Sequence, residues 1–132
     1  MGGFFGAVSH HDVVLDTFFG VDYHSHLGTR RAGMIIEDNG TFQREIHSIE
    51  NTPFRTRFEE DLPGFRGNSG IGCISDTDPQ PMLIRSKFGT YAICTIGMIN
   101  NTEELIDRCL AQTGGYFDAM TGGRVNTTEL VA

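Results

Sequence analysis

Histidine side chains are the first candidates for chemistry in this sequence. His24 and His26 stand one residue apart, and His10, His11 and Asp12 follow one another nearer the N-terminus. A zinc site needs three or four converging ligands, usually oriented by further hydrogen bonds. Neither group supplies such a set, so we expect no metal and no cofactor. We expect His26 to pack and form hydrogen bonds within the fold, and His10 and His11 to lie in solvent.

The thiols are the second candidates. Cys73, Cys94 and Cys109 are odd in number, lie far apart and form no Cys-x-x-Cys motif, which argues against a disulfide framework or a zinc knuckle. A reactive thiol needs a base or cation that lowers its pKa, and the sequence places none beside Cys73. We interpret all three as reduced thiols that pack as small apolar groups.

Size and charge limit the classes of function. A chain of 132 residues fits one domain and can bury a substantial core. The net charge of −7 and the lack of a basic cluster beyond Arg30 and Arg31 argue against a nucleic-acid partner. No apolar stretch approaches the roughly 20 residues that span a bilayer, and the N-terminus lacks the pattern of a signal peptide. We therefore expect a cytoplasmic protein with no membrane partner.

A strand and a helix are expected to open the chain. Residues 3–9 form a short apolar run typical of a buried strand. A helix should follow, with Asp12 as N-cap and Gly28 as its end. Apolar residues recur at helical spacing and predict one buried stripe, which comprises Val14, Leu15, Phe18, Phe19 and Tyr23.

Two sets of strands are expected next. Asn39-Gly40 supplies the positive backbone angles of a tight hairpin, and residues 69–75, 81–86 and 90–96 are separated by turn residues. Between these sets, the polar segment 52–65 predicts a short helix or an ordered loop. Its phenylalanines either form an interaction face or point into the core, and the pattern fits both; they are Phe54, Phe58 and Phe65.

Two helices are predicted near the C-terminus. Each is indicated by a pair of residues with the spacing of a capping side chain and an acid that bonds back to the helix start. The pairs are Asn101 with Glu104 and Asn126 with Glu129. The first helix should bury a face of Leu105, Ile106 and Cys109. The second is too short to be stable alone, so we expect the chain to be a part cut from a longer protein.

Several segments, in order, resemble motifs of class II glutamine amidotransferases, most closely the N-terminal half of glutamine phosphoribosylpyrophosphate amidotransferases. The opening MGGFFGAV resembles Met-Cys-Gly-Ile-x-Gly, and HLGTRRAGM, residues 26–34, resembles His-Arg-Gly-Gln-Glu-Ser-Ala-Gly-Ile. GIGCISDTDPQPMLI resembles Gly-Ile-Gly-His-x-Arg-Tyr-Ser-Thr followed by Gln-Pro. TIGMINNTEEL resembles His-Asn-Gly-x-Leu-x-Asn-x-x-Glu-Leu, and NTTELVA is similar to Ser-Asp-Thr-Glu.

The resemblance spans nearly the whole chain and implies an α+β fold of the N-terminal-nucleophile hydrolase type. That fold is an α/β/β/α sandwich of antiparallel sheets, here truncated, with residues 1–132 as one amidotransferase-like domain. In this family the N-terminal cysteine thiolate attacks the amide of glutamine, and the free α-amino group is the base. An Asn side chain and a Gly amide stabilise the oxyanion. An Arg and an Asp hold the charged ends of the substrate.

This sequence departs from the family at each of these chemical positions. The cysteine falls on Gly2, the Arg on Ser75, the oxyanion Asn on Ile96 and the acid on Thr127, whereas the glycine persists as Gly97. A glycine has no side chain that can attack, so no catalytic set is intact. The degenerate pocket would comprise His26, Gly28, Ser75, Gly97 and Thr127.

Three functional hypotheses follow. The first is a degenerate amidotransferase-like domain that lacks glutaminase activity and has a structural or regulatory role. Its partner would be a downstream domain of the same chain, and the resemblance implies that this domain is a phosphoribosyltransferase. A homo-oligomer is compatible with the sequence. The second is a module that binds a small metabolite or an amino acid through the Gly97 amide and the Ser75 hydroxyl. The third is an active amidotransferase that uses a non-standard residue such as Cys73. Gly70 and Gly72 would keep the close backbone packing of the family's site strand.

Overall fold

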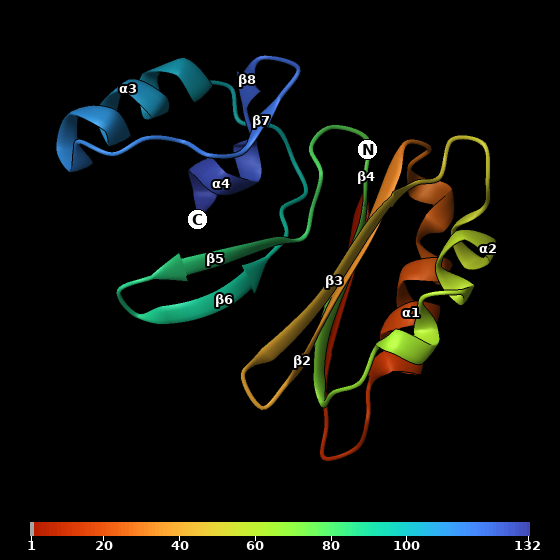
Figure 1. The fold of residues 1–132 in the computed structure, drawn as a ribbon. Coiled ribbons are helices and arrows are strands. Elements are labelled where there is room, and N and C mark those ends of the chain that lie inside the picture. Colours follow the sequence, from red (N-terminus) through yellow and green to blue (C-terminus); the bar gives the residue numbers. More distant parts are fainter. Residues whose placement is uncertain (1) are drawn as a thin grey trace.

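A four-stranded antiparallel sheet with the order β1-β4-β2-β3 is the centre of the fold. The computed structural model describes residues 2–132, without the side chain of Thr121. The sheet crosses the middle of Figure 1. Its strands are β1 (Gly3–Val8), β2 (Arg31–Asp38), β3 (Thr41–Ser48) and β4 (Ser69–Ser75).

The turn between β2 and β3 confirms the predicted hairpin. Asn39 and Gly40 have φ angles of 49° and 86°, the positive pair that a tight two-residue turn requires. The Gly40 amide donates a hydrogen bond to a carboxylate oxygen of Glu37 at 2.6 Å. Asp38 therefore pairs with Thr41, and this register continues along both strands.

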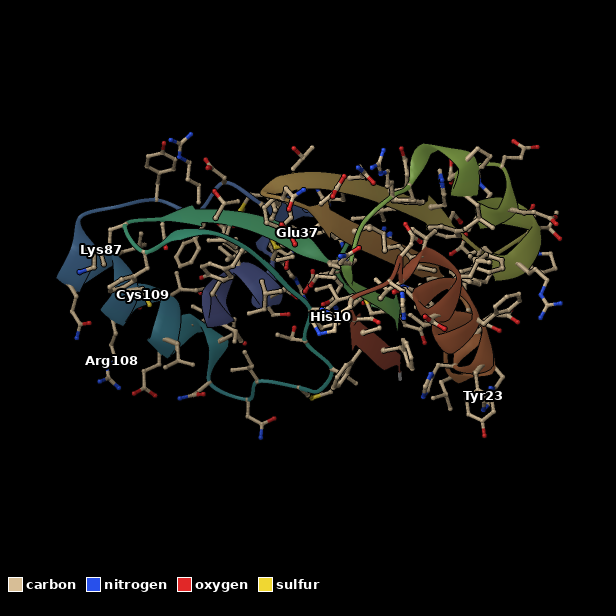
Figure 2. All side chains as sticks on the ribbon, turned by 90° about the horizontal axis from the view of Figure 1, so that it is seen from below. His10, Tyr23, Glu37, Lys87, Arg108 and Cys109 are labelled. Carbon is tan, nitrogen blue, oxygen red and sulfur yellow. The ribbon has the colours of Figure 1, made fainter. Side chains whose placement is uncertain are left out.

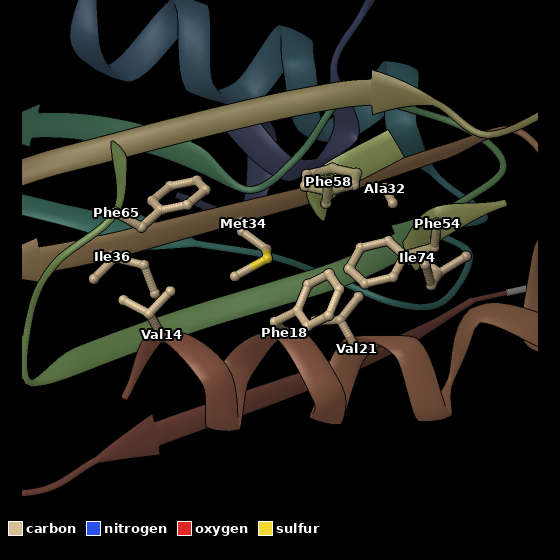
Figure 3. Packing of buried hydrophobic residues seen from close by; sticks show 10 residues of the cluster. All are labelled: Val14, Phe18, Val21, Ala32, Met34, Ile36, Phe54, Phe58, Phe65 and Ile74. Atoms are coloured by element: carbon tan, nitrogen blue, oxygen red, sulfur yellow. The ribbon is translucent and has the colours of Figure 1, made fainter. Parts of the chain in front are cut away.

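One face of the sheet is covered by helices and contains the main core (Figure 3). Phe54 stacks on Phe58, with ring centroids 4.6 Å apart, and lies 5.5 Å from the ring of Phe18. Phe65 is also buried. The phenylalanines of segment 52–65 therefore belong to the core and do not form an interaction face. The covering elements are α1 (Val14–Tyr23), α2 (Phe54–Glu59) and the short 3₁₀ turns η1 (Ser25–Leu27) and η2 (Leu62–Gly64).

Helix α1 buries only part of the predicted stripe, since Val14 and Phe18 are buried as expected and the other three residues are exposed. Leu15, Phe19 and Tyr23 are 56%, 52% and 77% exposed, and Tyr23 projects away from the ribbon in Figure 2. Apolar residues occur on both sides of this helix, so spacing alone did not identify the inner side. The helix ends at Tyr23, well before Gly28. Its buried residues are Val14, Thr17, Phe18 and Val21.

The start of α1 is tied to the segment that precedes β4. One carboxylate oxygen of Asp12 accepts the Val14 amide at 2.9 Å, and the other accepts the Gly67 amide at 3.0 Å. The N-cap of α1 is Val13, which has no capping side-chain bond, so the prediction of Asp12 as N-cap is wrong by one residue. Asp12 stands just before the cap and joins the helix to the segment that precedes β4.

Glycines in β4 let α1 approach the sheet closely. A Cβ atom added at Gly72 would lie 2.4 Å from Cγ2 of Val21, and one at Gly70 would lie 2.6 Å from Cδ1 of Ile36 and 2.7 Å from Oγ1 of Thr17. Such distances are too short for non-bonded atoms, so larger residues would push the helix away.

The second half of the chain lies on the opposite side of the large sheet (Figure 1). The predicted strand 90–96 is shorter than expected, because the Thr95 amide bonds to Gln80 instead of a neighbouring strand. The whole is a mixed α/β fold with antiparallel sheets. Its elements here are the pairs β5 (Met82–Ser86) with β6 (Gly89–Ile93) and β7 (Met120–Thr121) with β8 (Arg124–Val125), and the helices α3 (Thr102–Thr113) and α4 (Thr127–Val131).

The two C-terminal helices differ in how they are capped. The Asn126 side chain accepts the Thr128 amide at 2.9 Å, which confirms that cap. Asn101 stands at the N-cap of α3 without a capping side-chain bond. Glu129 does not complete a capping box, because its carboxylate accepts the amides of Asp118 and Ala119 at 3.0 and 2.8 Å.

The buried face predicted for α3 is only partly present. Ile106 is buried, whereas Leu105 and Cys109 are half-buried. Among the described residues, no helix is long and apolar enough to cross a membrane.

We predict that Gly72→Ala destabilises the protein by about 1–3 kcal/mol, because the added methyl group overlaps Val21 in a packed core. Urea denaturation measures the change. Gly64→Ala is the matched control, since a Cβ there has no atom within 4 Å, and its effect should stay within about 0.5 kcal/mol. Equal stability of the two variants would show that α1 does not pack against Gly72.

Candidate functional site

A pocket of about 290 Å³ lies where the end of β4, residues 95–98 and the start of α4 meet. A larger and more open groove of about 490 Å³ runs between the large sheet and β6, but none of the predicted site residues lines it. The smaller pocket is lined by Gly2, Ser75, Asp76, Thr77, Thr95, Ile96, Gly97, Met98 and Thr127.

The structure thus brings together most of the positions singled out in the sequence. Gly2, Ser75, Ile96, Gly97 and Thr127 are scattered along the chain, and all of them line this pocket. The motif resemblance assigns these positions to a single site, and such a site requires them to converge in this way.

His26 and Gly28 do not line the pocket. His26 is exposed in η1, so the prediction that it packs inside the fold is wrong, while Gly28 is buried just beyond that turn. The imidazole that packs here is His24, whose Nδ1 lies 2.8 Å from the Gly20 carbonyl oxygen.

A buried glutamine organises one wall of the pocket. Gln80 is 3% exposed, and its amide nitrogen donates to the Ser75 hydroxyl at 3.1 Å and the Thr95 carbonyl at 2.9 Å. Its amide oxygen accepts from the Thr95 backbone N–H at 2.7 Å and the Thr128 hydroxyl at 3.0 Å. The Thr95 N–H can only donate, so it fixes which end of the amide faces it. All four hydrogen-bonding positions of Gln80 are filled.

A buried carboxylate holds the start of α4. One oxygen of Asp78 accepts the Thr127 amide at 3.1 Å and the Thr127 hydroxyl at 2.6 Å. The side-chain amide nitrogen of Asn126 also donates a hydrogen bond to the Pro79 carbonyl oxygen at 3.2 Å. The Thr127 hydroxyl therefore donates its proton within the protein and not to the pocket.

The charged group at the pocket is negative. The Asp76 carboxylate accepts the backbone amides of Thr29 and Arg30 at 2.7 and 3.1 Å. The Thr29 bond, with support from Arg30 and against a smaller effect of burial, lowers the pKa of Asp76, so it is ionised at neutral pH. None of the described lining residues is Lys, Arg or His.

Gly2, the position that the motif resemblance assigns to a nucleophile, is crowded by backbone. A Cβ added at Gly2 would lie 2.3 Å from the Ile74 carbonyl oxygen and 3.0 Å from Cδ1 of Ile96. A carbonyl in a central strand cannot move aside as a flexible side chain can. The backbone around Gly2 therefore does not accommodate a side chain.

The remaining lining is mostly apolar or open. Gly97 has a φ angle of 140°, which favours glycine, and a Cβ there would meet no atom within 4 Å. Ile96 and Met98 are exposed beside it. This wall of the pocket is therefore hydrophobic.

The structure is unfavourable for Cys73 as a substitute nucleophile. Cys73 is fully buried and does not line the pocket. The side chain of Cys94, together with burial, raises the pKa of Cys73 well above the usual range, so Cys73 stays a thiol. The side chain of Cys73 lowers the pKa of Cys94, against the effect of burial.

Potential metal ligands gather away from the predicted histidines. His10 and His11 are exposed. In the described part of the chain, Glu45, His47 and Asp61 have ligand atoms within 4.8 Å of one another. His47 Nε2 lies 2.6 Å from a carboxylate oxygen of Asp61, so the pair already forms a short hydrogen bond between β3 and the turn after α2. No spacing in the sequence indicates this group, because Asp61 is distant from β3 along the chain.

Comparison with known proteins gives matches to solved structures alone. No protein-family model and no curated protein sequence matches the chain. Glutamine phosphoribosylpyrophosphate amidotransferase from B. subtilis, complexed with ADP and GMP, superposes with a TM-score of 0.78 at 23% identity, over 99% of this chain and 28% of that one. The allosteric regulatory enzyme of purine biosynthesis gives a TM-score of 0.74 at 22% identity, over 90% and 27%. The chain therefore shares the fold of a part of these proteins and spans about a quarter of their length.

Proposed function

We propose that this chain is a glutamine amidotransferase-like domain that does not hydrolyse glutamine and that has a structural or regulatory role in an amidophosphoribosyltransferase-like protein. The observation that carries the proposal is the position of Gly2, which lines the pocket where the family's nucleophile is expected. A hydrogen atom at that position cannot form a thioester with the substrate.

The fold supports the family assignment. The chain superposes over nearly its whole length on a glutamine phosphoribosylpyrophosphate amidotransferase. Helices α1 and α2, the large sheet, the β5–β6 hairpin and the helices α3 and α4 follow one another across the molecule. We infer that these layers correspond to the α/β/β/α sandwich of N-terminal-nucleophile hydrolases, and that a downstream phosphoribosyltransferase domain, in cytoplasmic purine biosynthesis, is the natural partner.

The pocket supports the loss of activity. Binding of an amino-acid carboxylate favours a guanidinium group, and the corresponding position is Ser75, whose hydroxyl bonds to Gln80. Among the described lining residues the charged side chain is the Asp76 carboxylate, which cannot take the place of a guanidinium group. Thr127 and Thr95 bond to Asp78 and Gln80. Most polar groups of the pocket thus stabilise the fold and leave few contacts for a polar substrate.

The purified chain should release no glutamate or ammonia from glutamine above the level of a heat-treated sample. Coupled detection of glutamate, with an active glutaminase as positive control, makes this measurement. Glutamine turnover that co-purifies with the folded chain would refute the proposal and would favour an active enzyme that uses another residue.

Restoring a cysteine should not restore activity. Gly2→Cys, prepared so that residue 2 carries the free amino group, should remain without glutaminase activity, because the pocket lacks the carboxylate clamp and the oxyanion Asn. It should also be less stable by about 1–3 kcal/mol, since its Cβ overlaps the Ile74 carbonyl. Gly64→Cys, prepared with the same N-terminus, controls for an added thiol at an open position. Glutamine hydrolysis by Gly2→Cys would show that the rest of the site is intact.

Calorimetry distinguishes a scaffold from a binding module. The pocket volume of about 290 Å³ is enough for a small metabolite, so the second hypothesis has a structural basis. For a scaffold we expect no saturable heat with glutamine, other amino acids or nucleotides. Saturable heat that is lost in Ser75→Ala would support the binding module instead.

A further inference from the structure

One imidazole and two carboxylates converge on the face of the large sheet that the helices cover. Glu45 and His47 are two residues apart on β3 and so point to the same face of the strand. Asp61 comes from the turn that follows α2. The ligand atoms of the three side chains all lie within 4.8 Å of one another. None of the three lines the pocket at the end of β4, so this cluster is a separate feature.

The fold holds the backbone of the cluster in place. His47 pairs with Ala32 of β2, and its ring packs edge-to-face against the buried ring of Phe58, with centroids 4.8 Å apart. The Asp61 amide donates to the Phe58 carbonyl at 3.0 Å, and the Asp61 carbonyl accepts the Gly64 amide at 2.9 Å. A ligand that binds here therefore requires movement only at the ends of side chains.

His47 is the side chain that faces both acids. Its Nε2 atom lies 2.6 Å from a carboxylate oxygen of Asp61 and 3.9 Å from one of Glu45. In the described part of the chain, no lysine or arginine forms an ion pair with either acid. A neutral imidazole does not balance two carboxylates, so the cluster attracts a cation and offers it a nitrogen and oxygen atoms as ligands.

The ligand types select the class of cation. Imidazole together with carboxylates suits Zn²⁺ and related transition metals, whereas Mg²⁺ and Ca²⁺ prefer shells made of oxygen alone. With bonds of about 2.1 Å, two ligand atoms of a tetrahedral zinc site are roughly 3.4 Å apart. The separations of 2.6 and 3.9 Å at His47 lie on either side of this value, so small side-chain rotations produce the required geometry.

We propose that Glu45, His47 and Asp61 bind a divalent transition-metal cation of the Zn²⁺ class, through Nε2 of His47 and one oxygen of each carboxylate. The cation replaces the hydrogen that lies between Nε2 and Asp61, and the imidazole binds as the tautomer that carries its hydrogen on Nδ1. A hollow of about 370 Å³, which Glu45 and Asp61 help to line, has room for a water molecule as the fourth ligand.

A bound cation would cross-link β3 to the turn after α2, which the His47–Asp61 hydrogen bond joins in the protein alone. The expectation of no metal was based on other histidines, near the N-terminus, and none of them belongs to this cluster. The proposal does not depend on the proposed function, because the cluster and the pocket at the end of β4 share no residue.

NMR of the histidine side-chain nitrogens during a Zn²⁺ titration of the full chain tests the proposal. The thiols are kept reduced with a phosphine, and His47→Gln assigns the His47 signals. We expect the Nε2 signal of His47 to shift before those of His10 and His11, and to stay in place when Mg²⁺ is added. A His47 signal that does not move with Zn²⁺, moves only after His10 and His11, or responds equally to Mg²⁺ would overturn the proposal.

A single substitution distinguishes a metal ligand from a hydrogen-bond partner. Glu45→Gln removes one ligand and leaves the His47–Asp61 hydrogen bond intact. Without metal it should melt at the wild-type temperature, whereas its affinity for Zn²⁺, measured by calorimetry, should fall by roughly tenfold or more. Glu59→Gln is the matched control, because Glu59 is exposed on α2 and lies outside the cluster, and it should bind Zn²⁺ as the wild type does.

Equal affinity for Zn²⁺ in the wild type and in Glu45→Gln would overturn the three-ligand site. The cluster would then be only a hydrogen bond between His47 and Asp61. An equal loss of affinity in Glu59→Gln would also contradict the proposal, because it would assign the bound Zn²⁺ to general surface charge.

Discussion

The side-chain amide of Gln80 is excluded from water, so all of its hydrogen bonds must be made within the protein. Its partners come from three places: Ser75 at the end of the large sheet, Thr95 after β6 and Thr128 in α4. Loss of any partner would leave a buried polar group unsatisfied, at a cost of about 1–3 kcal/mol. The two halves of the molecule are therefore joined by a network that is stable only when complete.

The same network maintains the pocket without a contribution from catalytic side chains. The residues that hold the backbone in place are not the residues that the family's reaction would need. Gly70 and Gly72 allow α1 to pack on β4, and Gln80 with Asp78 keeps residues 95–98 and α4 in place. None of these contacts needs a nucleophile or a guanidinium group. Under the proposed function, Gly2 and Ser75 stand where the reaction would need a cysteine and an arginine, and the scaffold around them does not depend on either side chain.

Local signals in the sequence predicted the elements well, and long-range contacts limited the rest. Asn39-Gly40 determines its own turn, and Asn126 caps its own helix, so both were predictable. The inner side of α1 was not, because Leu15 and Phe19 have the same helical spacing as the buried residues. Motif order predicted that Gly2, Ser75, Ile96, Gly97 and Thr127 lie together, and all five line one pocket. The exposure of His26, in contrast, depends on tertiary packing that no local pattern contains.

Hydrogen exchange at the Thr95 amide tests most directly whether Gln80 holds the two halves together. In the wild-type protein this amide donates to a buried side chain, so it should exchange slowly, as the central amides of β4 do. In Gln80→Leu the Thr95 amide loses its acceptor and should exchange at least tenfold faster, while the β4 amides stay protected. If Thr95 exchanges at the same rate in both proteins, Gln80 is not the link between the sheets and the account of the pocket fails.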